Sequence, residues 1–79
     1  MWLDFKDTSG MDWVINTDHV LAIRLDKTAL HLLLPFVLSS TSGHILPIRS
    51  FATEEEAAMM LGRIRDALHE GVRVFTVGD

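Results

Sequence analysis

The sequence holds four histidines and no cysteine, so the first chemistry to consider is metal binding by imidazole. A zinc site needs three or four ligands that converge within about 2.0–2.3 Å of the ion. The strand pattern described below points His19 and His44 inward near strand ends and His31 outward, while His69 lies near the end of a predicted helix. Because these four side chains do not converge, we expect no metal site and no cofactor.

Catalytic motifs are also missing from the sequence. There is no thiol nucleophile, no G-x-S-x-G elbow, no P-loop and no G-x-G-x-x-G loop. Ser42 and His44 lie two residues apart in "STSGH", which is typical of a polar hairpin loop, and the three glutamates at 54–56 are typical of a helix first turn. We therefore expect a protein that is not an enzyme.

One group of residues has the composition of an anion-binding patch. On the predicted outer face of the sheet, Arg24 and Arg49 are diagonal neighbours of His31, and Phe51 shares the row of His31. Two arginines, an imidazole and an aromatic ring could bind a phosphate, a carboxylate or an RNA base, as in β-sheet proteins that read RNA. The alternative is that the arginines line the rim of an apolar subunit interface.

Charge and composition narrow the function classes. The chain has 79 residues, 7 of them basic and 11 acidic, for a net charge of −4. This balance disfavours binding to nucleic acid and to anionic membranes, although a small regulatory nucleic-acid-binding protein stays the alternative function. We expect one domain, residues 1–79, and no signal peptide in "MWLDFK". The absence of cysteine fits a reducing cytoplasm.

The most apolar stretch is "ALHLLLPFVL", residues 29–38. It is too short for a membrane helix, which needs about 20 apolar residues, and Pro35 would break a helix interior. Alternate positions carry large apolar side chains, which predicts a strand with one face in the core. We expect no membrane partner.

Two hairpins are predicted around this strand. A turn at Asp26-Lys27 sets Ile23 opposite Leu30 and Leu21 opposite Leu32, so that the large aliphatic residues share one face. A loop at residues 39–43 returns the chain so that Phe36 faces Leu46 and Leu34 faces Ile48. The same register places Pro35 opposite Pro47, which predicts a bend in the sheet.

A helix follows, at about residues 53–70. Thr53 and Glu56 match a capping box, and Gly71 is a typical helix stop. Short strands are expected at 2–7, 11–16 and 72–77. The predicted fold is α+β: a strongly bent antiparallel β-meander of five to six strands with one α-helix packed on one face. The core is expected to contain Leu21, Ile23, Leu32, Leu34, Phe36, Ile64 and Leu68.

One helix cannot cover both faces of the sheet, and the other face carries its own apolar cluster. Its members are Val20, Leu33, Pro35, Val37 and Ile45. Exposed clusters of this kind often mark interaction sites, and a small chain without disulfides gains stability from association. We expect a homo-oligomer that buries this face. The predicted function is a small non-enzymatic self-associating interaction module for an unknown macromolecular partner.

The layout also resembles a bacterial family. "VINTDHVLAIRLD" followed by "GHILPIRSFATEEEAAMML" is similar to short flagellar regulatory proteins of the FlbD type, over Val14 to Leu61. The chain departs from that layout in its longer apolar strand, its two prolines and its C-terminal strand. The resemblance implies a compact β-meander plus helix without a known active site, and no functional residue is carried over from it.

Overall fold

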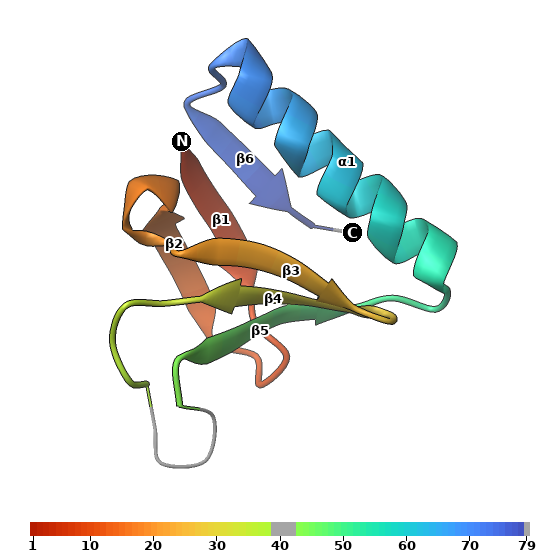
Figure 1. Cartoon of the computed structure of the whole chain (residues 1–79), viewed down its shortest axis with the longest axis horizontal. Coiled ribbons are helices and arrows are strands. Elements are labelled where there is room, and N and C mark those ends of the chain that lie inside the picture. Colours follow the sequence, from red (N-terminus) through yellow and green to blue (C-terminus); the bar gives the residue numbers. More distant parts are fainter. Residues whose placement is uncertain (39–42, 79) are drawn as a thin grey trace.

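The structure, a computed structural model, describes residues 1–38 and 43–78 and contains six strands, one α-helix and one short 3-10 helix (Figure 1). The predicted loop at residues 39–42 lies outside the described residues. The strands are β1 (Trp2–Lys6), β2 (Asp12–Asn16), β3 (Ala22–Asp26), β4 (Ala29–Leu33), β5 (Ile45–Ser50) and β6 (Val74–Val77). The helices are η1 (Thr17–His19) and α1 (Glu54–Glu70). The predicted α+β class, with six strands and one helix, is confirmed.

The strands form two three-stranded sheets, in the orders β2-β1-β6 and β3-β4-β5. We call them the terminal sheet and the central sheet. All pairs are antiparallel except β1 with β6, which run parallel with Leu3 beside Phe75. This pair departs from the predicted antiparallel pattern, because α1 carries the chain back to start β6 beside the start of β1 (Figure 1).

The β3–β4 hairpin turns one residue later than predicted. Lys27 and Thr28 form the turn, Lys27 has a φ of 57°, and Ile23 lies opposite Leu32 rather than Leu30. The predicted register is therefore wrong by two residues. Because side chains alternate with a period of two, an even shift keeps the apolar residues of both strands on one face.

The β4–β5 register also differs from the prediction. Leu32 lies opposite Leu46, and His31, not Pro35, lies opposite Pro47. Strand β4 ends at Leu33, two residues before Pro35, so the two prolines do not face one another. The irregularity predicted for this sheet occurs as a β-bulge between Leu30 and His31.

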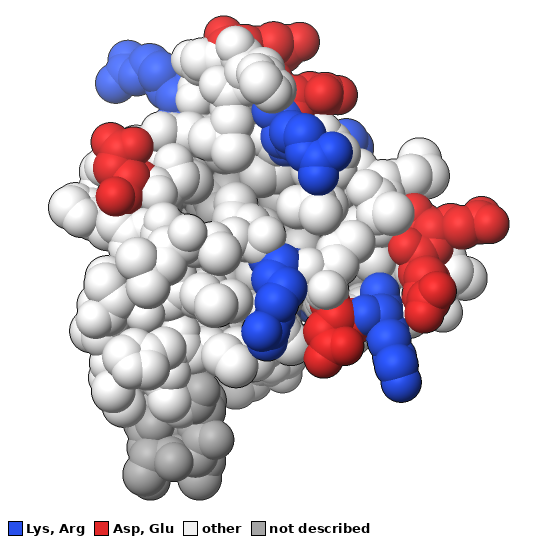
Figure 2. Space-filling model, viewed as in Figure 1, with Lys and Arg blue, Asp and Glu red and all other residues white. Residues whose placement is uncertain are grey.

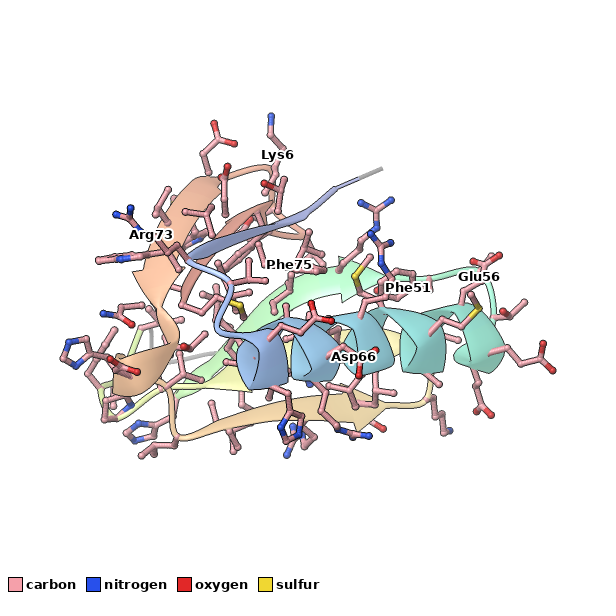
Figure 3. The ribbon with its side chains drawn as sticks, turned by 90° about the horizontal axis from the view of Figure 1, so that it is seen from above. Lys6, Phe51, Glu56, Asp66, Arg73 and Phe75 are labelled. Carbon is pink, nitrogen blue, oxygen red and sulfur yellow. The ribbon has the colours of Figure 1, made fainter. Side chains whose placement is uncertain are left out.

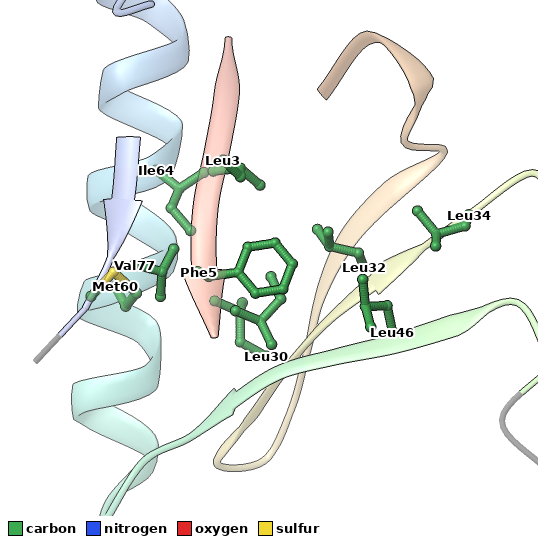
Figure 4. Packing of buried hydrophobic residues seen from close by; sticks show 10 residues of the cluster. Leu3, Phe5, Leu30, Leu32, Leu34, Leu46, Met60, Ile64 and Val77 are labelled. Atoms are coloured by element: carbon green, nitrogen blue, oxygen red, sulfur yellow. The ribbon is translucent and has the colours of Figure 1, made fainter. Parts of the chain in front are cut away.

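The core lies between the two sheets and α1. Leu3, Phe5 and Val77 of the terminal sheet meet Leu30, Leu32 and Leu46 of the central sheet (Figure 4), with Leu34, Ile48, Ala57, Met60, Ile64 and Ala67 also buried. Of the predicted core, Leu32, Leu34 and Ile64 are fully buried and are confirmed. The cluster draws on both sheets, so the chain forms one domain.

Four predicted core residues lie elsewhere. Leu21 and Phe36 keep 70% and 48% of their surface exposed because they lie just outside β3 and β4, where the strand alternation no longer applies. Leu68 keeps 44% exposed near the end of α1, and Ile23 is half-buried. The prediction of complete burial is wrong at these positions.

The helix begins and ends as predicted. The Thr53 hydroxyl accepts a hydrogen bond from the Glu56 amide at 3.1 Å, and Gly71 ends α1 with a φ of 73°. Three glutamates occupy the positive first turn. In Figure 1, α1 runs beside β6 and above β3, so one strand from each sheet lies next to it.

Candidate interaction surfaces

Arg24 and His31 form an exposed pair on the central sheet. They lie directly opposite one another on β3 and β4, and Arg24 Nη2 lies 3.4 Å from His31 Nδ1. The register predicted them as diagonal neighbours, and the two-residue shift makes them a direct pair. A guanidinium and an imidazole at this distance can together contact an anion.

Arg49 and Phe51 form a second pair. The Arg49 guanidinium carbon lies 5.6 Å from the centroid of the Phe51 ring, which is cation–π geometry. The bulge sets Arg49 opposite Leu30, while Pro47 lies opposite His31. Within the predicted patch, Arg24 contacts His31 and Arg49 contacts Phe51.

A second cation–π pair lies farther along α1. The Arg63 guanidinium carbon lies 5.8 Å from the ring centroid of Phe75. Figure 3 places Phe51 beside the first turns of α1, near Glu56, and Phe75 beside its middle. These two arginines pack on aromatic rings that adjoin the core.

A hollow lies between the β1–β2 hairpin and β5. It encloses about 460 Å³, and its lining includes Trp13, Met11, Leu38 and Pro47. Asp7 lies at its rim and accepts hydrogen bonds from the Trp13 indole at 2.7 Å and from the Ser9 hydroxyl at 2.7 Å. Sequence reasoning missed this hollow, since only the "DTSG" turn signal points to Asp7.

The bonds to Asp7 also shift its acidity. The Ser9 hydroxyl first, then the Trp13 indole and the backbone amides of Met11 and Ser9, lower the pKa of Asp7 to about 2. Hydrogen bonds to the ionised form produce this direction of shift. The carboxylate thus ties the hairpin turn to Trp13, which is a structural role.

A narrower hollow runs between α1 and β3. It encloses about 250 Å³ and is lined by Ile23, Leu61, Ile64, Arg65 and Leu68. Leu61, Arg65 and Leu68 follow one another at helical spacing and face β3. We call this the β3 groove. The sequence pattern placed Ile23 and Leu68 in a closed core, whereas the structure leaves this groove open beside them.

Large apolar side chains are exposed at one end of the central sheet. Leu21, Phe36 and Val37 are 70%, 48% and 60% exposed, close to where β3 begins and β4 ends. We call these three residues the apolar end. Figure 2 shows no Lys, Arg, Asp or Glu on the lower left of the molecule, where this part of the chain lies.

The predicted oligomer interface is only partly open. Val20, Leu33 and Ile45 are half-buried within one copy of the chain, whereas Pro35 and Val37 are exposed. Neighbouring segments cover part of the face, because Ile45 and Pro47 also line the hollow beside the β1–β2 hairpin.

Among residues 1–38 and 43–78, no three His, Cys, Asp or Glu side chains are grouped so that they could hold a metal ion. His44 Nδ1 lies 3.1 Å from the Leu34 carbonyl oxygen, and His31 pairs with Arg24. Within the same residues, no helix is long and apolar enough to cross a membrane.

Comparison with known proteins finds no family model, no curated protein and no solved structure that matches this chain. The resemblance to FlbD-type proteins stays a prediction. The geometry described above is therefore the ground for a functional proposal.

Proposed function

We propose that this chain is a small, non-enzymatic interaction module that associates with itself and binds another macromolecule. The observation that carries the proposal is the apolar end. Leu21, Phe36 and Val37 are exposed near one end of the central sheet, and the lower left of Figure 2, where this end lies, shows no Lys, Arg, Asp or Glu. Apolar surface gathered in this way commonly marks a site of protein interaction.

The size of the core supports the same proposal. A chain of 79 residues without cysteine has no disulfide to stabilise it, and a core of this size supplies only about 3–5 kcal/mol. Burial of Leu21 against a second copy would add apolar contact that the single chain lacks. The absence of cysteine also agrees with a reducing compartment, and we place the protein in a bacterial cytoplasm.

Leu21 is the residue that tests self-association best. Its side chain is 70% exposed, so Leu21→Glu should leave the fold intact while introducing a charge at the contact. Met59→Glu is the matched control, because Met59 is 69% exposed on α1, away from the apolar end. Circular dichroism on both variants verifies that the monomer is folded.

Sedimentation of the wild type, Leu21→Glu and Met59→Glu then tests whether the chain associates with itself. We expect the wild type and Met59→Glu to associate as concentration rises, and Leu21→Glu to stay at the mass of one chain. Apolar association should hold or strengthen with added salt, whereas binding to phosphates weakens steeply. A wild type that stays monomeric, or that binds nucleic acid with a steep loss in salt, contradicts the proposal.

A further inference from the structure

The outer side of β3 is an open sheet edge. In the part of the chain that the structure describes, β4 is the only strand paired with β3. Figure 3 shows β3 as the outermost ribbon beside α1, with no strand beyond it. An edge of this kind offers unpaired backbone groups to another strand.

The turn geometry tells which backbone groups point outward. A two-residue turn at Lys27-Thr28 makes Asp26 and Ala29 a hydrogen-bonded pair. Hydrogen-bonded pairs alternate along an antiparallel ladder, so Arg24 and His31 form the next one. The N–H and C=O groups of the residues between, Ile23 and Leu25, therefore point away from β4 into the open edge.

The residues along this edge are self-complementary. Residues 21–25 read Leu-Ala-Ile-Arg-Leu, with apolar positions arranged symmetrically about Ile23. In an antiparallel pair centred on Ile23, the two Ile23 residues face one another, and Leu25 of one copy lies beside Leu21 of the other, which precedes β3 and donates its amide to the Leu33 carbonyl at 2.8 Å. Ala22 then lies opposite Arg24, so no like charges meet directly. A two-fold dimer contact requires such self-complementarity.

Other two-fold registers fit less well. A pair centred on Arg24 sets two guanidinium groups directly opposite one another, which is destabilising. A pair centred on Leu25 sets Ile23 against Lys27, which belongs to the turn and has a φ of 57°. Of these three registers, only the one centred on Ile23 keeps the inward β3 positions, Ile23 and Leu25, opposite apolar residues, and it brings the exposed Leu21 beside the contact.

The β3 groove supports the same contact. It opens beside Ile23 and is lined by Leu61 and Leu68 of α1. Joining two β3 strands by a two-fold axis perpendicular to the sheet places both helices on the same side, with their groove-lining residues toward the axis. Leu68, now 44% exposed, and Leu21 would then be covered.

We infer that the chain forms a two-fold dimer through antiparallel pairing of β3 with β3 of a second copy, centred on Ile23. This inference rests on the proposed self-association and names its surface. The result is a continuous six-stranded sheet in the order β5-β4-β3-β3-β4-β5. Phe36 and Val37, beyond the end of β4, stay outside this contact and are left for the macromolecular partner.

Single cysteines test the register, because the native sequence has none. Residues that face one another in a hydrogen-bonded pair have Cα atoms about 5.5 Å apart, within the range of about 4.4–6.8 Å that a disulfide spans. We expect Ile23→Cys to form a disulfide-linked dimer on mild oxidation. Arg24→Cys and Leu25→Cys should stay monomeric on denaturing gels, since diagonal neighbours are about 7–8 Å apart or more.

A second cross-linking experiment covers the case in which Ile23→Cys does not fold. A mixture of Ala22→Cys and Arg24→Cys proteins, whose two positions lie within β3 and face one another in this register, should cross-link between the two variants, while either variant alone should not. If neither cross-linking experiment yields a disulfide in proteins that sediment as dimers, the β3 contact is wrong. The proposed self-association is then unaffected. A disulfide in Arg24→Cys or Leu25→Cys alone shows another register and also overturns it. A monomeric wild type overturns both proposals.

Discussion

The two edges of the central sheet differ in how they are protected. On β5, Pro47 has no N–H to offer, a bulge disrupts the ladder, and the Thr8 amide donates to the Pro47 carbonyl at 3.4 Å. On β3 there is no proline and no bulge, and the inward residues Ile23 and Leu25 are apolar. Proteins commonly block edges that must not pair, so the difference agrees with the proposed pairing through β3.

The two edges also differ in which parts of the chain shape them. The β5 edge is closed by residues distant in sequence, because the β1–β2 hairpin reaches across to it. The β3 edge is shaped only by its own hairpin and by α1. Changes in the shared strand β4 should therefore affect both edges, whereas changes in either hairpin should affect one.

The largest loss of stability is expected from a substitution in β4, the strand that pairs with both β3 and β5. Leu32 is fully buried opposite Ile23 and Leu46, so Leu32→Ala should lower the free energy of unfolding by about 2–5 kcal/mol. A loss of this size would unfold much of the population at room temperature, as measured by urea denaturation. Phe36→Ala is the control, since its half-exposed ring should cost less. Equal losses would contradict the assigned faces.

The next effect concerns the helix above the β3 groove. Thr53→Ala removes the hydroxyl that accepts from the Glu56 amide, and the free energy of unfolding should fall by about 1 kcal/mol. Thr53→Ser retains the hydroxyl and should retain most of the stability. A denaturation midpoint that is unchanged in Thr53→Ala would argue against this helix start.

A smaller gain is expected at the turn that fixes the β3 register. Lys27 has a φ of 57°, which costs an L-residue roughly 1–2 kcal/mol, while glycine loses about 0.5–1 kcal/mol more backbone entropy on folding. Lys27→Gly should therefore stabilise the fold by about 0.5–1 kcal/mol in chemical denaturation. Thr28→Gly, at a position without positive φ, should not stabilise it. The reverse ranking would exclude this turn geometry.

The hairpin that covers β5 should respond to pH. The pKa of Asp7 is lowered to about 2 in the folded chain, against about 3.9 when unfolded. Its contribution to stability is therefore full above pH ~4 and is lost as pH falls toward ~2. The wild type should be more stable than Asp7→Asn at neutral pH, and the difference should vanish near pH 2. A difference that is constant across this range would show that the carboxylate charge is irrelevant.

Much of the fold can be predicted from the local sequence pattern, and the errors in that prediction have one cause. The capping box, Gly71 and the alternation in "ALHLLL" correctly predicted α1 and the buried face of β4. The β3–β4 register was wrong by two residues, and the β4–β5 register by four residues at Leu32 and by three beyond the bulge, because alternation defines which face a residue occupies but not its partner. The lengths of β3 and β4 depend on tertiary contacts, and this explains why Leu21 and Phe36 were placed in the core.

The candidate surfaces were harder to predict. The parallel β1–β6 pair joins residues more than 70 positions apart in the sequence, and no local pattern reports such a contact. The bulge sets Arg49 opposite Leu30, and bulges leave little trace in a single sequence. The open β3 edge depends on where all other strands pair, which the sequence alone does not show.

Hydrogen exchange at the β3 edge tests the central claim most directly. The amides of Ile23 and Leu25 point into the open edge, so their exchange, followed by NMR, should slow as protein concentration rises and dimers form. The Arg24 amide, which faces β4, should be protected at every concentration and serves as the internal control. Exchange rates of Ile23 and Leu25 that stay the same from dilute to concentrated protein would contradict the account.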